Sequence, residues 1–168
     1  MKGIVRYFFP CLFVDALEDI DLARLWRLGI RGLIVDLDNT LVAWNAYDLP
    51  ERIACWVAKA KEQGFAICIV SNALEERVAY FSRLLAIPGI SKARKPRRGA
   101  FRVALETLGL QRNQVAVIGD QVFTDVLGGN RLGLYTILVR PISRREFFLT
   151  RLGRFFERLV LRRFTSHD

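Results

Sequence analysis

The chain has 168 residues, of which 52% are hydrophobic and 26% are charged, and its formal net charge is +9. This length fits one domain with a substantial core, and no apolar run approaches the roughly 18–20 residues of a membrane span. The only histidine, His167, lies beside the C-terminus, which excludes catalytic triads, Cys–His pairs and histidine-ligated zinc. Three widely spaced cysteines without a CxxC pattern favour a reducing compartment. We therefore expect a cytoplasmic protein, or one on the cytoplasmic face of a membrane.

Positive charge is concentrated in two segments of the chain. Residues 91–102 contain six basic residues and no acidic one, and residues 140–164 contain eight arginines against two glutamates. A basic protein with such focused clusters favours an anionic partner, which could be a phosphorylated substrate, an anionic lipid or a nucleic acid. Solubility alone is the simpler explanation of the same charge.

The apolar pattern predicts helices and strands in alternation. The predicted helices cover 19–28 or 21–28, 51–63, 74–85, 99–108 and 124–132. The predicted strands cover 31–36, 65–70, 115–118 and 134–139, with a strand-like stretch at 89–91. Because these strands are almost continuously apolar, they predict a Rossmann-like, doubly wound parallel α/β sheet. We expect one domain, with an apolar N-terminal segment (1–30), a catalytic core (31–139) and a basic C-terminal helix and tail (140–168).

The two ends of the chain each allow two interpretations. The apolar run YFFPCLFV at residues 7–14 could insert shallowly into a membrane, or it could pack on the core or on a second copy. Ser143 and Glu146 fit a capping box, and the following residues to 164 predict a basic amphipathic helix. Its arginines could bind anionic headgroups, or its apolar stripe could pack on the sheet and leave them solvated.

Polar residues follow the ends of three predicted strands. They are Asp36 and Asp38, Ser71, and Asp120, with Lys95 and Asp125 in the loops beyond. An open parallel sheet binds its ligands at the carboxyl ends of its strands. Since burial of an unpaired carboxylate is unfavourable, function explains the aspartates better than a strand-end turn does.

These residue types suit phosphoryl transfer. A carboxylate can attack phosphorus and form an aspartyl-phosphate, and a second carboxylate can protonate the leaving oxygen and later activate water. Mg²⁺ held by Asp36 and Asp120 would offset the repulsion between phosphate and carboxylates. Lys95 would add positive charge in the transition state, and Thr40 and Ser71 would offer hydroxyl donors.

Four stretches together resemble the motifs of the haloacid dehalogenase (HAD) phosphatase superfamily, subfamily III. They are DLDNT at 36–40, Ser71-Asn72, Lys95-Pro96 and GDQVFTD at 119–125. The resemblance implies that Asp36 is the nucleophile and Asp38 the general acid and base. It also implies that Asp36, Asp120 and the main-chain carbonyl of Asp38 hold Mg²⁺, while Asp125 supports the metal or orients Lys95. The residues implied to bind the substrate phosphate are Thr40, Ser71, Asn72 and Lys95.

The spacing of these motifs leaves no room for a cap domain. Only short segments separate Thr40 from the next predicted helix and Asn72 from Lys95. Without a lid, exclusion of water must come from the substrate or from the surface that carries it. We therefore expect an uncapped site that suits a substrate embedded in something large.

Within the superfamily, the chain is similar to the YqeG-type group, which is related to the phosphatidylglycerophosphatases of mitochondria and plastids. The similarity includes the run at 119–133 and the basic helix after 136–141. It implies dephosphorylation of phosphatidylglycerophosphate to phosphatidylglycerol by a peripheral membrane enzyme. The alternatives are a soluble phosphatase of small-molecule or protein phosphates, and a nucleic-acid-binding protein that uses the basic clusters, although no recognised nucleic-acid module is present. Homo-oligomer formation is left open.

Overall fold

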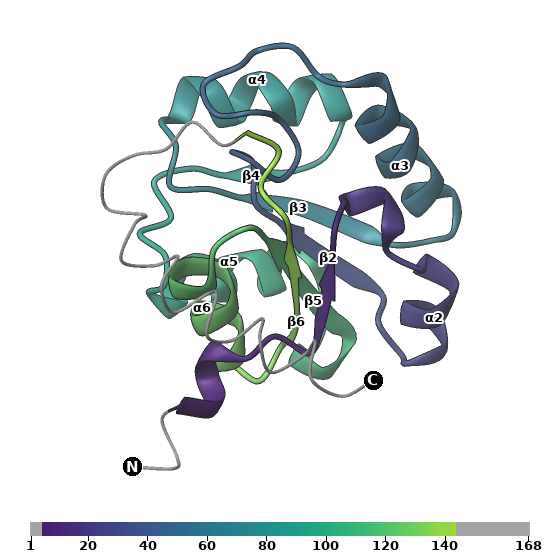
Figure 1. The fold of residues 1–168 in the computed structure, drawn as a ribbon, viewed down its shortest axis with the longest axis vertical. Coiled ribbons are helices and arrows are strands. Elements are labelled where there is room, and N and C mark those ends of the chain that lie inside the picture. Colours follow the sequence, from purple (N-terminus) through teal and green to yellow (C-terminus); the bar gives the residue numbers. More distant parts are fainter. Residues whose placement is uncertain (1–4, 144–168) are drawn as a thin grey trace.

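A computed structural model describes residues 5–143 and contains a six-stranded sheet in which every pairing is parallel (Figure 1). The order of the strands in the sheet is β1-β6-β5-β2-β3-β4. The strands are β1 (Leu12–Val14), β2 (Gly32–Val35), β3 (Ala66–Val70), β4 (Gly89–Ile90), β5 (Val115–Gly119) and β6 (Tyr135–Val139). The predicted parallel α/β fold is thus confirmed, and four of these strands match the predicted ranges closely.

Helices cover both faces of the sheet. The α-helices are α2 (Leu22–Arg27), α3 (Glu51–Glu62), α4 (Glu75–Leu85), α5 (Arg98–Leu108) and α6 (Leu127–Asn130). Three short 3₁₀ turns and one π-helical turn complete the fold: η1 (Arg6–Phe8), η2 (Leu17–Asp19), η3 (Arg112–Gln114) and η4 (Val122–Val126). Helices α2, α3 and α4 pack on one face, and α5 and α6 pack on the other (Figure 1).

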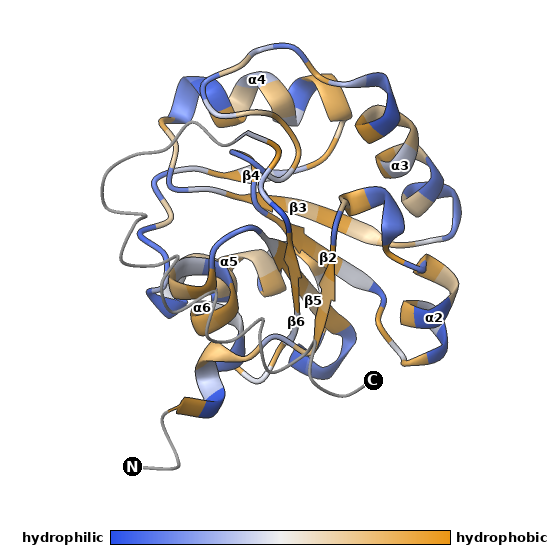
Figure 2. Ribbon diagram, in the orientation of Figure 1, coloured by the Kyte–Doolittle hydropathy of each residue, from blue (hydrophilic) through white to orange (hydrophobic). Residues whose placement is uncertain are grey.

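The alternation of side chains along each strand divides the core into two layers. In β2, Leu33 and Val35 pack with residues of α2, α3 and α4, whereas Ile34 packs with Phe101 of α5. Successive residues of a strand point to opposite faces, so a strand that is covered on both faces must be apolar throughout. Figure 2 shows this as apolar strands between helices that are polar on their outer sides.

The carboxyl ends of β2 and β5 meet at the switch point of the sheet. After β2, the chain builds β3 and β4 on one side, then returns to build β5 and β6 on the other. Ligands bind in the crevice at such a switch point in doubly wound sheets. The two strand ends that carry Asp36 and Asp120 are therefore neighbours, as their pairing shows.

The apolar N-terminal segment contributes an edge strand that the sequence analysis did not predict. Strand β1 pairs with β6, with Leu12 beside Ile137. Half-buried Phe8 and Phe13 pack against a buried cluster of Val122, Val126 and Leu138. The side-chain amide of Asn130 also donates hydrogen bonds to the carbonyl oxygens of Tyr7 and Phe9, at 2.8 and 2.9 Å. These contacts favour the packing interpretation of residues 7–14 over insertion into a membrane.

The structure does not form the single helix that the sequence predicts at 124–132. The chain forms the π-helical turn η4 and then the single turn α6. Gly128 and Gly129 explain the close packing here, because a Cβ on Gly128 would lie 2.4 Å from the Phe101 ring. A π-helical turn is rare and is often found at functional sites.

The predicted basic C-terminal helix lies outside the described residues, except for its capping residue. Ser143 donates a hydrogen bond from its Oγ to Oδ1 of Asn39, at 2.9 Å. Among residues 5–143, no helix combines the length and apolar character that would be needed to cross a bilayer.

Candidate active site

Three buried carboxylates lie together at the switch point of the sheet. Asp36 directly follows β2, Asp120 directly follows β5, and Asp125 belongs to η4. One carboxylate oxygen from each of the three lies within 4.8 Å of those of the other two. Three of the four aspartates predicted to hold a metal are therefore brought together by the fold, from positions up to 89 residues apart in the sequence.

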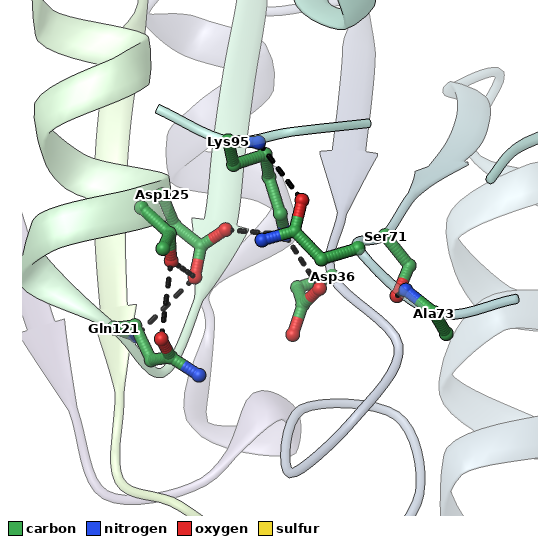
Figure 3. A network of polar contacts seen from close by, with 8 residues as sticks. Asp36, Ser71, Ala73, Lys95, Gln121 and Asp125 are labelled. Carbon is green, nitrogen blue, oxygen red and sulfur yellow. Dashed lines mark hydrogen bonds and ion pairs between the residues drawn. The ribbon is translucent and has the colours of Figure 1, made fainter. Parts of the chain in front are cut away.

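Lys95 reaches into this carboxylate cluster and pairs with two of its members. Its Nζ donates to Oδ1 of Asp36 at 2.5 Å and to Oδ1 of Asp125 at 2.6 Å. Figure 3 shows the lysine side chain between the two aspartates. Its side chain is only 3% exposed. The contact with Asp125 supports the prediction that this aspartate orients the lysine.

Hydrogen bonds join the loop that carries Lys95 to the end of β3. The backbone N–H of Lys95 donates to Oδ1 of Asn72 at 2.8 Å, and that of Ala93 donates to the carbonyl oxygen of Ser71 at 3.0 Å. Arg94, between them, adopts a left-handed backbone conformation with φ of 52°, which is uncommon for residues other than glycine. The hydrogen bonds on either side hold this loop in place, and so the position of Lys95 depends on the Asn72 side chain and on the backbone of Ser71.

Gly119 allows Asp125 to approach the end of β5. A Cβ on this glycine would lie 2.2 Å from the Asp125 carboxyl carbon, well inside any van der Waals contact. Oδ2 of Asp125 also accepts hydrogen bonds from the backbone N–H of Gln121 and from Oγ1 of Thr124, both at 3.3 Å. The glycine in GDQVFTD thus has a steric role, which is to leave room for the carboxylate that orients Lys95.

Burial and mutual repulsion shift the titration of the cluster. Burial raises the pKa of Asp36 from 3.8 to about 7, even though Lys95 opposes that shift. The pKa of Asp120 is raised well above its usual value by burial and by the charges of Asp36 and Asp125. Burial disfavours the charged form of Lys95, but the two carboxylates outweigh it and raise the pKa of this lysine above its ordinary value. The lysine is therefore cationic at neutral pH.

The second aspartate of DLDNT points to a different partner. Both Nε and Nη2 of Arg77 donate to Oδ1 of Asp38, at 3.1 and 2.8 Å. Arg77 lies in the first turn of α4 and is buried. The sequence analysis missed this arginine, although one signal was present: Arg77 precedes the buried Phe81 by four residues, and so it shares the inward side of the helix.

The predicted phosphate-binding residues have different surroundings. Ser71, Asn72 and Lys95 line a cavity of about 250 Å³ together with Asp36 and Asp38. Ser71 is buried, and its Oγ accepts a hydrogen bond from the backbone N–H of Ala73 at 3.1 Å. This hydroxyl can therefore donate its proton to a phosphate oxygen.

Thr40 is buried and is not among the residues that line this cavity. Its Oγ1 has no hydrogen-bond partner among the described residues. The structure therefore does not bring Thr40 to the cavity surface, and its role in binding phosphate stays a prediction.

The carboxylate cluster fits a divalent cation. Its donor atoms are all carboxylate oxygens, which hard cations such as Mg²⁺ prefer, and Oδ1 of Asp120 is buried with no hydrogen-bond partner in the part of the chain that the structure describes. Buried polar atoms are almost always paired, so an unpaired carboxylate oxygen indicates a missing ligand. Among the described residues, only Lys95 is within ion-pair distance of any of the three carboxylates. A bound cation would neutralise the remaining negative charge.

Replacement of Asp120 by Asn tests this charge imbalance. We expect Asp120→Asn to raise the free energy of unfolding of the metal-free protein by about 1–2 kcal/mol at pH 7.5, because it removes a buried, unpaired charge. A raised carboxyl pKa stabilises the fold at low pH, and this contribution is lost as pH rises through the folded pKa. Because the pKa of Asp120 is raised well above its usual value, its carboxyl is already neutral in the folded protein at pH 4, and the variant should gain little there.

Thermal unfolding with and without millimolar MgCl₂ checks this prediction. Mg²⁺ should raise the Tm of the wild type more at pH 7.5 than at pH 5, since protons compete for the carboxylates. It should raise the Tm of Asp120→Asn much less. An equal Mg²⁺ response in both proteins would show that the ion binds elsewhere.

The chain is similar to known phosphatases over most of its length. A family model described as HAD-hydrolase-like matches residues 92–141. The Bacillus subtilis (strain 168) protein named "Probable phosphatase YqeG" is 44% identical over 156 residues, which cover 93% of this chain and 91% of that protein. The Arabidopsis thaliana protein "Phosphatidylglycerophosphate phosphatase 1, chloroplastic/mitochondrial" is 28% identical over 94% of this chain, which spans about half of that relative (48%).

Solved structures share the fold at low sequence identity. The cobalt-bound deoxy-D-mannose-octulosonate 8-phosphate phosphatase of Haemophilus influenzae matches with a TM-score of 0.56 at 15% identity, over 74% of this chain and 75% of that one. Such a likeness supports the arrangement of strands and helices and no finer property. The extensive identity to the Bacillus protein, together with the aspartates at the switch point of the sheet, shows that this chain belongs to the HAD-like hydrolases, in the family of the YqeG phosphatase.

Proposed function

We propose that this phosphatase is a magnesium-dependent phosphomonoester hydrolase that converts phosphatidylglycerophosphate to phosphatidylglycerol at the cytoplasmic face of a membrane. The observation that carries the chemistry is the cluster of Asp36, Asp120 and Asp125 around Lys95, beside a cavity that Asp38 also lines. The named substrate of the plant relative supports the choice of lipid.

Two aspartates would divide the reaction into two steps. An oxygen of Asp36 attacks phosphorus, the bond from phosphorus to the leaving oxygen breaks, and a proton moves from Asp38 to that oxygen. Water then attacks phosphorus, the bond to Asp36 breaks, and Asp38 takes a proton from the water. The products are the alcohol and inorganic phosphate, and the enzyme returns to its starting state.

The remaining residues would provide charge and position. Asp36, Asp120 and Asp125 would hold Mg²⁺, together with the main-chain carbonyl of Asp38. The ion would favour the ionised form of the nucleophile and offset the negative charge around the phosphate. Lys95, already 2.5 Å from Asp36, places its ammonium where negative charge gathers.

The residues at the mouth of the cavity support the proposal that the substrate lies in a membrane surface. Two large apolar side chains line the cavity: Trp44 is 46% exposed and Leu74 is 71% exposed. Beside Leu74 lies the loop between β4 and α5, whose Lys92 donates its backbone N–H to the carbonyl oxygen of Ala73 at 3.0 Å. Between Thr40 and Lys95, the described chain contains only α3, β3, α4, β4 and their loops, so no domain inserted there covers the cavity.

Membrane association would then be peripheral. Apolar and cationic side chains together suit the boundary between headgroups and acyl chains. The proposed contribution of the arginine-rich C-terminal segment concerns residues outside the described part of the chain, and it stays a prediction.

Phosphate release from phosphatidylglycerophosphate in mixed micelles with Mg²⁺ tests this function. We expect kcat/KM for the lipid to exceed that for glycerol 3-phosphate and other soluble esters by at least about tenfold, since apolar contact adds binding energy. Leu74→Ser should lower turnover of the lipid more than turnover of soluble esters. Leu84→Ser, which alters an exposed leucine near the other end of α4, is the matched control.

Sedimentation with vesicles separates the lipid function from the soluble one. The protein should bind vesicles that contain phosphatidylglycerol and bind pure phosphatidylcholine vesicles weakly. Turnover of soluble esters alone, with no vesicle binding, would contradict the proposal and favour a soluble phosphatase.

A further inference from the structure

Arg77 is a buried cation whose main partner is a catalytic aspartate of the proposed reaction. Its side chain is 8% exposed, and that of Asp38 is 14% exposed. The residue lies in the first turn of α4, which begins just after the loop that closes β3. Neither the motif pattern of the sequence nor the carboxylate cluster explains why an arginine is buried here.

The two hydrogen bonds between Arg77 and Asp38 end on the same oxygen. Nε and Nη2 both donate to Oδ1, at 3.1 and 2.8 Å. A carboxylate usually receives the fork of an arginine on both of its oxygens. With Oδ1 occupied by two charged donors, the other oxygen, Oδ2, is the one on which a proton can sit.

Aromatic rings hold the guanidinium from a second direction. Its Cζ lies 5.0 Å from the ring centroid of Tyr47 and 5.3 Å from that of Phe81. The two rings are nearly parallel, at an angle of 20° and a centroid distance of 6.1 Å. Tyr47 belongs to the loop that follows DLDNT, whereas Phe81 belongs to α4, so the arginine is fixed by contacts from both elements.

Geometry of this kind suits proton transfer more than it suits stability. Nη1 of Arg77 is buried without a hydrogen-bond partner among residues 5–143, which is unfavourable for folding. A general acid, by contrast, gains from a fixed orientation, since a small displacement of the proton donor slows transfer strongly. One N–H group of Arg77 is thus left unpaired among the described residues, but the other donors of its guanidinium keep Oδ1 of Asp38 in a defined place.

We propose that Arg77 is a positioning residue for the general acid and base: it binds Oδ1 of Asp38 so that Oδ2 gives the proton to the leaving oxygen and later takes one from water. This inference rests on the proposed function, because it assigns Arg77 to the proton-transfer step of that reaction. Arg77 acts through Asp38 and does not contact the substrate.

Substrates with different leaving groups test this role. An alkyl phosphate such as glycerol 3-phosphate needs a proton on its leaving oxygen, whereas 4-nitrophenyl phosphate has a leaving group that departs without one. Because kcat/KM reports the steps up to departure of the leaving group, we expect Arg77→Met to lower kcat/KM for the alkyl ester on the order of tenfold to a hundredfold. The aryl ester should lose much less of its kcat/KM. Arg83→Met, an exposed arginine on the same helix, is the matched control.

A double-mutant cycle with Asp38 gives the second, independent measurement, on phosphatidylglycerophosphate or whichever alkyl ester the wild type hydrolyses. If Arg77 acts through Asp38, Arg77→Met should cause no further loss of kcat in an Asp38→Ala background. Arg77→Lys should restore part of the activity that Arg77→Met loses, since it returns a charged donor.

The outcomes separate this inference from the function on which it rests. Equal losses of kcat/KM with both leaving groups, or a full additional loss in the Asp38→Ala background, would show that Arg77 supports only the fold. A wild type that hydrolyses no phosphate ester would instead overturn the proposed function. Thermal unfolding of each variant identifies any loss that comes from misfolding.

Discussion

Asp36→Asn should reduce phosphate release by at least about a thousandfold, whichever ester is tested, since removal of a nucleophile eliminates the covalent route. The substitution exchanges one oxygen for an amide nitrogen and leaves the shape of the side chain almost unchanged. It also removes one of three mutually repelling buried carboxylates. We therefore expect the variant to fold and to unfold at the same Tm as the wild type or a higher one.

Trapping of the phosphoryl group on the protein tests the identity of the nucleophile directly, in addition to the rate of phosphate release. Acid quenching of the wild type during turnover should leave radiolabelled phosphate on the protein, and Asp36→Asn should carry none. Asp19→Asn, an exposed aspartate in η2, is the matched control and should behave as the wild type. Label that persists in Asp36→Asn would assign the nucleophile to another residue, and Asp38 would then be examined first.

Lys95→Met should have the largest effect on stability. It removes the only cation that pairs with Asp36 and Asp125 among the described residues, and all three side chains are less than a tenth exposed. Loss of one partner of a buried ion pair destabilises a protein by about 3–5 kcal/mol. For a chain of this size, that corresponds to a fall in Tm of about 10 °C. Urea unfolding without Mg²⁺ measures the change.

A second substitution shows whether unpaired charge is the cause of the lost stability in Lys95→Met. Asp125→Asn added to Lys95→Met removes a carboxylate left without its partner, so the double variant should regain part of the lost free energy of unfolding. Mg²⁺ should also stabilise Lys95→Met more than it stabilises the wild type, since the ion meets a more negative site. Lys92→Met, in the same loop but exposed, should stay near the wild-type stability. A double variant that is no more stable than Lys95→Met would attribute the loss to packing.

Much of the site could be predicted because strand ends in a parallel sheet share one edge. Once β2, β3 and β5 were recognised as buried apolar runs, the polar residues behind them had to meet. Asp36, Asp120 and Asp125 do meet, and Lys95 joins them. That prediction needed only the direction and neighbourhood of the strands, which hydrophobic pattern determines well.

What the sequence analysis missed depends on contacts between distant segments. Arg77 and Asp38 are 39 residues apart, and an arginine in an amphipathic helix is ordinarily expected on the solvent side. Strand β1 has three residues and follows a proline, which is too short a stretch for periodicity to reveal. In the π-helical turn at Val122–Val126, Asp125 lies against Gly119, which is a tertiary contact that no local propensity encodes.

The pairing of β1 with β6 also affects how the chain can fold. Leu12 and Ile137 are neighbours in the sheet but lie 125 residues apart in the sequence. At roughly 5–20 residues per second of synthesis, the first strand is complete several seconds before its partner exists. During that interval, the apolar residues 7–14 have no sheet edge to cover and resemble the exposed segments that chaperones bind. High contact order of this kind slows folding, so β1 is expected to dock last, as the step that closes the edge of the sheet.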